Sequence, residues 1–254
     1  MLTILGPAKT IDMTPHSVTE RHSEPAYMEQ AEMLVNQLRR YSVSQLKKLM
    51  KVSDQLATLT FERYAGWTRS YGAKEGRQAI LAFSGEVFNG LQARSLSEEQ
   101  LLFGQDHVRI LSGLYGVLKP LDLILPYRLE MGTKMKFAQW KNLYEYWNEI
   151  IPDRIIGDTG QQEPPALINL ASNEYFKSIR PRDFPYRIIT PVFRESEGEG
   201  YRNVTIYAKK ARGMMLRFIL SNRINDPEEL KAFDEEGYGF NPHLSEENNW
   251  VFSR

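Results

Sequence analysis

Short apolar segments are spread over the whole chain, from its first residues to its last third. Residues 2–5, 78–83, 167–170 and 186–193 each predict a buried strand. Because no repeat or low-complexity linker divides the chain, strands from both halves are needed to complete one sheet. We therefore expect an α/β (mixed α+β) fold, a single compact domain over residues 1–254 with a central mixed sheet and surrounding helices.

Helical spacing and capping signals place further elements. Apolar residues at the spacing of one helix face predict a helix over 26–40. Ser97, with Gln three residues later, forms a capping box that starts a helix over 98–104. Residues 201–208 predict a strand that pairs with 186–193 in a hairpin around an acidic turn.

The composition excludes several kinds of function. The chain has no cysteine, so it has no disulfide scaffold, thiolate nucleophile or iron–sulfur ligand. Its histidines lack the spacing of metal ligands, and no glycine-rich phosphate loop or nucleophile elbow occurs. The four histidines are His16, His22, His107 and His243. We expect neither a metal site nor a cofactor.

The N-terminal segment has no signal-peptide pattern, because its short apolar run is preceded by no basic residue and is interrupted at Pro7. No window approaches the roughly 20 apolar residues of a membrane helix. We therefore expect a cytoplasmic protein without membrane contact. Separately, we expect a monomer.

Two glycines near the middle of the chain form the most informative motif. Gly113 and Gly116 would join two helices, where glycines let backbone N–H groups reach an anion. The pattern is typical of a helix–hairpin–helix DNA-binding element, over about residues 105–123. Tyr115 is an extra residue between the glycines, so a tight helix–helix turn without a ligand is the alternative. The phosphate-binding candidates here are Arg109, Gly113, Tyr115, Gly116 and Lys119.

The formal net charge of zero, from 32 basic and 32 acidic side chains, conceals an asymmetry. Residues 201–223 carry six basic and no acidic side chains, whereas the acidic C-terminal stretch, residues 224–254, carries eight acidic and two basic ones. A helix over 209–223 would begin with lysines, which its dipole disfavours unless an anion binds there. The alternative is a solvated helix entry. The anion-binding candidates are Lys209, Lys210 and Arg212.

Further polar residues follow predicted strands or lie in polar turns, where residues commonly face a cleft. A lysine in a cleft binds a phosphate, or acts as a nucleophile if desolvation lowers its pKa. Ordinary surface turns are the alternative for each residue. The candidates of this group are Lys9, Arg128, Glu130, Asn173, Glu174 and Lys177.

Six strings of the sequence together resemble the YaaA family, which is linked to bacterial peroxide-stress resistance. They are PAKT at 7–10, RQAILAF at 77–83, LSGLYGVLKPLD at 111–122, PYRLEMG at 126–132, NLASNEYF at 169–176 and YAKKARG at 207–213. The resemblance extends from the first residues to about Tyr238. Gly6 differs from the Ser that the family pattern has before Pro7.

The resemblance implies a cytoplasmic protein that limits damage from hydrogen peroxide and is associated with lower free intracellular iron. It also implies an unusual single-domain α/β fold with a helix–hairpin–helix-like element and a basic cleft that binds double-stranded DNA. Our hypothesis assigns DNA contacts to Lys9, Gly113, Gly116, Lys119, Arg128, Lys209, Lys210 and Arg212.

The first functional hypothesis is therefore a peroxide-response protein that binds double-stranded DNA through phosphates, without sequence preference. It requires that Lys9, Lys119, Arg128 and Lys209 line one groove.

The alternative is an enzyme acting on a nucleotide or a damaged nucleic acid. Lys9 would be its nucleophile or phosphate ligand, and Glu130 or Glu174 its general acid or base. An iron-binding protein would have to use the acidic C-terminal stretch, which we expect to be a solvated surface.

Overall fold

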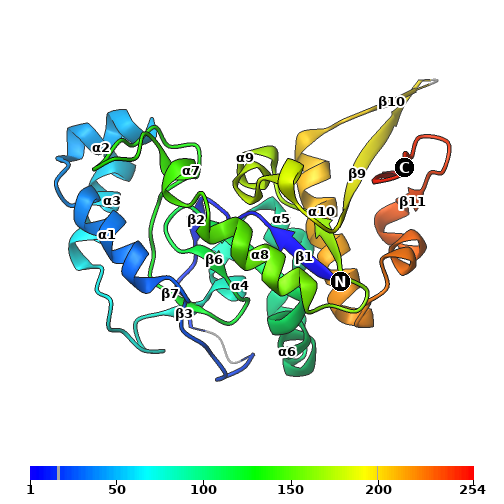
Figure 1. Cartoon of the computed structure of the whole chain (residues 1–254), viewed down its shortest axis with the longest axis horizontal. Coiled ribbons are helices and arrows are strands. Elements are labelled where there is room, and N and C mark those ends of the chain that lie inside the picture. Colours follow the sequence, from blue (N-terminus) through cyan, green and yellow to red (C-terminus); the bar gives the residue numbers. More distant parts are fainter. Residues whose placement is uncertain (16–17, 199) are drawn as a thin grey trace.

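The computed structural model describes residues 1–15, 18–198 and 200–254, and eight strands among them form one mixed sheet (Figure 1). The strands of this sheet are β1 (Leu2–Leu5), β5 (Val108–Ser112), β6 (Gly116–Leu118), β8 (Ala166–Asn169), β9 (Arg187–Glu197), β10 (Gly200–Arg202), β11 (Gly239–Phe240) and β12 (Asn249–Ser253). Their order is β11-β12-β9-β8-β1-β5-β6, with β10 paired to β9. Neighbours from β12 to β5 are parallel, and β6, β10 and β11 are antiparallel to their partners.

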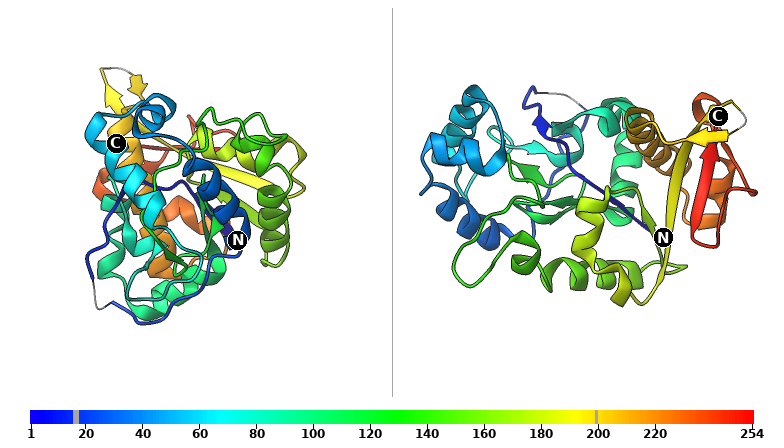
Figure 2. Two further views of the ribbon diagram at one scale, coloured as in Figure 1. Left: turned by 90° about the vertical axis from the view of Figure 1, so that its left-hand side faces the viewer. Right: turned by 90° about the horizontal axis from the view of Figure 1, so that it is seen from above.

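Helices cover both faces of the sheet. The helices are α1 (Met28–Leu38), α2 (Val43–Met50), α3 (Asp54–Gly66), α4 (Ala79–Ala82), α5 (Glu86–Leu91), α6 (Glu98–His107), α7 (Leu143–Tyr146), α8 (Ile150–Gly160), α9 (Asn173–Phe176) and α10 (Thr205–Asn222). Viewed from above, α5, α6 and α10 lie on one side of the sheet and α8 on the other (Figure 2). The group α1 to α3 lies at the opposite end of the molecule from β11 (Figure 1). The mixed α/β fold is therefore confirmed.

Short 3₁₀ helices and two small sheets complete the chain. The 3₁₀ helices are η1 (Ala93–Ser95), η2 (Lys177–Ile179), η3 (Pro181–Asp183), η4 (Pro227–Ala232) and η5 (Glu235–Gly237). The small sheets pair β2 (Thr10–Ile11) with β4 (Phe83–Ser84) and β3 (Arg77–Gln78) with β7 (Leu123–Ile124).

Several elements confirm the sequence-based expectations. The predicted first strand is β1, and all four of its side chains are buried. The segment predicted as a helix over 26–40 contains α1. Ser97 accepts a hydrogen bond from the backbone N–H of Gln100, whose side chain accepts one from the backbone of Ser97, so the capping box starts α6.

Two strand predictions were wrong in part. The apolar run at 78–83 contains the helical turn α4, because burial on all sides removes the alternation that distinguishes a strand from a buried helix. Of residues 201–208, only the first two remain in β10, and α10 already begins at Thr205. Lys209 therefore lies in the second turn of the helix, beyond the first turn where the helix dipole is strongest.

The helix–hairpin–helix expectation for residues 105–123 was wrong. After α6 the chain forms the antiparallel strands β5 and β6, whose residues are all buried. The Ser112 hydroxyl oxygen accepts hydrogen bonds from the backbone N–H groups of Leu114 and Tyr115. These two donors are therefore already satisfied and are not free to bind a phosphate. Gly113 and Gly116 serve close packing: a Cβ on Gly113 would lie 2.3 Å from the Leu129 carbonyl oxygen, and one on Gly116 would lie 2.7 Å from the Trp147 ring.

A buried carboxylate fastens the loop before α1 to the segment after β6. Asp122 is 3% exposed and accepts hydrogen bonds from the Ser23 hydroxyl at 2.6 Å and the Lys119 backbone N–H at 2.8 Å. Burial raises its pKa to about 6, despite these hydrogen bonds. Because the folded state binds this proton more tightly than the unfolded state, Asp122 lowers the stability as the pH rises from about 4 to about 6.

We expect Asp122→Asn to remove this pH dependence. The free energy of unfolding of the variant minus that of the wild type should increase by about 2 kcal/mol between pH 4.5 and pH 7.5. Urea unfolding of both proteins at the two pH values measures this difference. An equal difference at both pH values would show that Asp122 titrates in its ordinary range.

Candidate functional site

A cleft of about 460 Å³ lies where the parallel strands β1 and β8 end. The carboxyl ends of parallel strands meet at one edge of a sheet, and ligands of α/β proteins commonly bind there. The segment after β1, the segment after β8, the start of α5 and the middle of α10 all reach this cleft. Its lining includes Gly6, Lys9, Glu86, Phe88, Tyr127, Arg128, Glu130, Ser172, Glu174, Tyr175, Lys209 and Arg212.

Six of the predicted residues meet in this cleft although they come from four separate segments. They are Lys9, Arg128, Glu130, Glu174, Lys209 and Arg212. Of the four cations that the DNA hypothesis places in one groove, Lys9, Arg128 and Lys209 line the cleft, and Lys119 does not. The cleft is therefore the candidate functional site.

Glu130 links two of the cations. Its Oε2 lies 2.8 Å from the Lys9 Nζ, and its Oε1 accepts a hydrogen bond from the Arg128 guanidinium at 3.3 Å. The Arg128 side chain is 15% exposed, and its Nε is buried without a hydrogen-bond partner within the described residues. Lys9 is exposed at the mouth of the cleft, so a charged amine and a half-buried carboxylate are in contact where a ligand can reach both.

Helix α10 contributes two further cations to the lining. Lys209 is exposed and Arg212 is half-buried. Neither forms an ion pair with a carboxylate in the described parts of the chain. Burial lowers the pKa of the Arg212 guanidinium. A half-buried charge without a counter-ion is costly, so an anion in the cleft would be bound favourably at Arg212.

Aromatic rings and a second carboxylate complete the lining. The Tyr127 hydroxyl lies 2.8 Å from the Ser112 Oγ, and burial raises the pKa of both Tyr127 and Tyr175. Glu174 accepts the Gly132 backbone N–H at 2.8 Å. Sequence reasoning missed Glu86 and Phe88, although the Ser84-Gly85 pair directly after an apolar run signals that the chain turns there.

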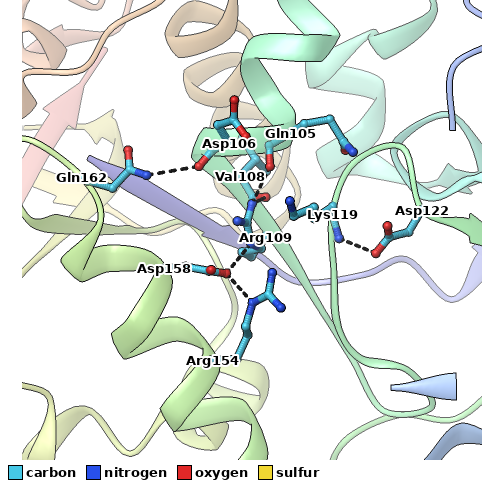
Figure 3. Close-up of polar contacts among 9 residues, drawn as sticks. All are labelled: Gln105, Asp106, Val108, Arg109, Lys119, Asp122, Arg154, Asp158 and Gln162. Carbon is cyan, nitrogen blue, oxygen red and sulfur yellow. Dashed lines mark hydrogen bonds and ion pairs between the residues drawn. The ribbon is translucent and has the colours of Figure 1, made fainter. Parts of the chain in front are cut away.

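Arg109 and Lys119 lie in a different cavity, at the amino end of β5 and beside α8 (Figure 3). The Arg109 Nε donates to the Asp158 Oδ2 at 2.6 Å, and the Arg154 Nε reaches the same oxygen at 2.7 Å. The Arg109 side chain is 5% exposed. Burial alone would raise the pKa of Asp158, but the hydrogen bonds from the two guanidinium groups outweigh burial and lower it. Arg109 thus ties β5 to α8.

The remaining candidates lie outside the cleft. Gly113, Tyr115 and Gly116 are buried in the core, and the Tyr115 hydroxyl accepts the Trp67 indole N–H at 3.0 Å. Lys210 is paired with Glu236 at 2.5 Å. Asn173 and Lys177 are exposed on α9 and η2, and they do not line the cleft.

Neither a metal-binding cluster nor a membrane-spanning helix is found in the described part of the chain. No three His, Asp or Glu side chains there are grouped as metal ligands. No helix in residues 1–15, 18–198 and 200–254 is long and apolar enough to cross a membrane. Of the four histidines, His16 lies outside the described residues.

The fold and the cleft define an α/β protein with a charged site at the carboxyl ends of parallel strands. A family model described as "Peroxide stress protein YaaA" matches residues 1–244. The chain is 44% identical to a "UPF0246 protein" of Janthinobacterium sp. (strain Marseille), over all of this chain and 98% of that protein. It is 45% identical to one of Dechloromonas aromatica (strain RCB), over all of this chain and 99% of that protein. The chain belongs to the peroxide stress protein YaaA family.

The Arg109–Asp158 pair predicts a large effect on stability. Asp158→Asn would leave a buried guanidinium without its counter-charge, which we expect to cost about 3–5 kcal/mol of the free energy of unfolding. Asp183→Asn is the matched control, because its pair with Arg180 is exposed and should contribute less than about 1 kcal/mol. Urea unfolding measures both. Equal effects would show that the buried pair contributes no more to stability than the exposed one.

Proposed function

We propose that this chain is a cytoplasmic peroxide-stress protein that binds double-stranded DNA, as a monomer and without sequence preference. The cations of the cleft would contact phosphates, which carry no sequence information. DNA held in this way would be protected from iron-dependent oxidative damage. Membership of the peroxide-stress family supports the physiological setting, and the electrostatics of α10 support the choice of ligand.

One observation carries the proposal: ion pairs or hydrogen bonds within the chain engage four of the six basic side chains at residues 201–223. Arg202 pairs with Glu197, Lys210 with Glu236 and Arg223 with Glu99. Arg217 donates to the backbone carbonyl groups of Leu91 and Gln92 and to the Ser95 hydroxyl.

Among the described residues, this leaves Lys209 and Arg212 as the two basic side chains of the run without a carboxylate partner or backbone acceptor, and both line the cleft. A polyanion would supply the counter-charge that these two side chains lack.

The two neighbouring lysines give a sharp test. Lys209→Ala should weaken duplex binding and reduce the slope of log affinity against log salt by about one, because one phosphate contact is lost. Lys210→Ala should change both far less, because Glu236 already neutralises that charge. Fluorescence anisotropy with a labelled duplex at several salt concentrations measures affinity and slope. Equal weakening by the two substitutions would reject the argument that Glu236 neutralises Lys210, and no effect of either would reject α10 as part of the DNA interface.

A second candidate function rests on the contact between Lys9 and Glu130. A carboxylate in contact with a lysine can act as the base that takes the proton the amine must lose before it attacks a carbonyl carbon. The amine would attack the aldehyde carbon of an abasic site in DNA and release water. The resulting imine would allow strand cleavage. This is the enzymatic alternative on damaged nucleic acid.

Borohydride reduction tests this candidate, since it converts the imine into a stable secondary amine. If Lys9 is the nucleophile, a labelled abasic duplex should become covalently attached to the wild-type protein. Lys9→Ala should abolish the adduct, and Lys134→Ala, an exposed lysine outside the cleft, should retain it. The adduct is read on a denaturing gel. Absence of any adduct with the wild type would reject the imine-forming enzyme, and DNA binding would remain as the proposed function.

A further inference from the structure

The size of the cleft limits what can enter it. A volume of about 460 Å³ falls in the range of pockets that enclose one small molecule, from about 300 to 1,000 Å³. A DNA duplex is too large to enter a cleft of this volume and can contact only its rim. One nucleotide can enter it.

The charges in the cleft are mixed, which does not suit a phosphate chain alone. Glu86, Glu130 and Glu174 lie among the cations, and each carboxylate repels phosphate oxygens. Nucleobase edges, in contrast, present N–H donors, such as the exocyclic amino groups of adenine and cytosine. A nucleotide therefore matches the lining better than a bare phosphate does, with its phosphate toward Arg212 and its base toward the carboxylates.

The apolar part of the lining suits the face of a base. Phe88, Tyr127 and Tyr175 line the cleft, and each of them, 4–7% exposed, contributes a small apolar surface to it. Enzymes that take a base out of the stack hold it between aromatic or apolar side chains and read its edge through hydrogen bonds. The same combination of rings and acceptors is present here.

We infer that the cleft accepts a single nucleotide, extruded from the DNA that Lys9 and Lys209 hold at the rim. This inference rests on the proposed DNA binding and adds what the cleft itself takes: a base against the rings and carboxylates, and a phosphate at Arg212. Extrusion of the nucleotide involves no covalent change. Its removal from the stack requires only that the cleft contacts offset a few kcal/mol of lost stacking and pairing.

A duplex with one 2-aminopurine tests the inference, because this base fluoresces weakly when stacked and strongly when extruded. At saturating wild-type protein, we expect the fluorescence to rise at least threefold, first with 2-aminopurine in a mismatch, where extrusion is cheapest. Arg212→Gln should reduce the rise to less than half. Arg223→Gln, at the far end of α10 and paired with Glu99, makes the same change of charge and should retain it. Anisotropy on the same samples reports binding independently.

The outcomes separate the inference from the proposed function. Duplex binding with unchanged fluorescence at every position tested would overturn extrusion and leave DNA binding standing. No duplex binding, but calorimetric binding of free deoxyadenosine monophosphate, would overturn both and identify a free nucleotide as the ligand. A fluorescence rise equal in Arg212→Gln and wild type would show that the nucleotide leaves the stack without entering this cleft, which also overturns the inference.

Discussion

The pairing of β1 between β5 and β8 is the constraint on which the rest of the molecule depends. The three strands come from distant parts of the chain. Strand β1 lies between the other two and pairs with β5 along one edge and with β8 along the other. Because the three strands are parallel, the segments that follow β1 and β8 leave the sheet at the same edge. That geometry places Lys9 in the same cleft as Ser172 and Glu174, although about 160 residues separate them in the sequence. The same strand pairing therefore builds the centre of the sheet and brings together residues of the candidate site.

The close packing of α10 against α5 shapes the part of the cleft that these two helices line. A Cβ on Gly213 would lie 1.7 Å from the Val87 carbonyl oxygen, so only glycine permits the two helices to approach so closely. Lys209 and Arg212 directly precede this crossing point, and the close approach brings them to the cleft. The glycine in the YAKKARG string therefore has a packing role that positions its basic neighbours.

The sequence predicted the cleft residues better than it predicted the central motif, for physical reasons. Lys9 and Glu174 follow predicted strands, and strand ends are recognisable from local patterns. Arg109 and Lys119 were misplaced because their surroundings are set by α8, whose Asp158 is 49 residues from Arg109. Glycines at a buried turn and at an anion-binding turn look the same in a sequence. What distinguishes them here, the Leu129 carbonyl and the Trp147 ring, comes from segments that follow later in the chain.

A chain with a net charge of zero can still have a site that favours an anion. Ion pairs within the chain neutralise some basic side chains and leave others without a counter-charge. Glu236, in the acidic C-terminal stretch, pairs with Lys210 rather than with its neighbour Lys209. Arg212 is held half-buried among apolar residues of α10, where no carboxylate of the described chain reaches it. Burying a charge without a partner raises the free energy of the folded state, and an arriving phosphate would recover that cost. Violations of this kind are typical of functional sites. The unpaired arginine, more than the number of basic residues, therefore supports the proposal that an anion binds in the cleft.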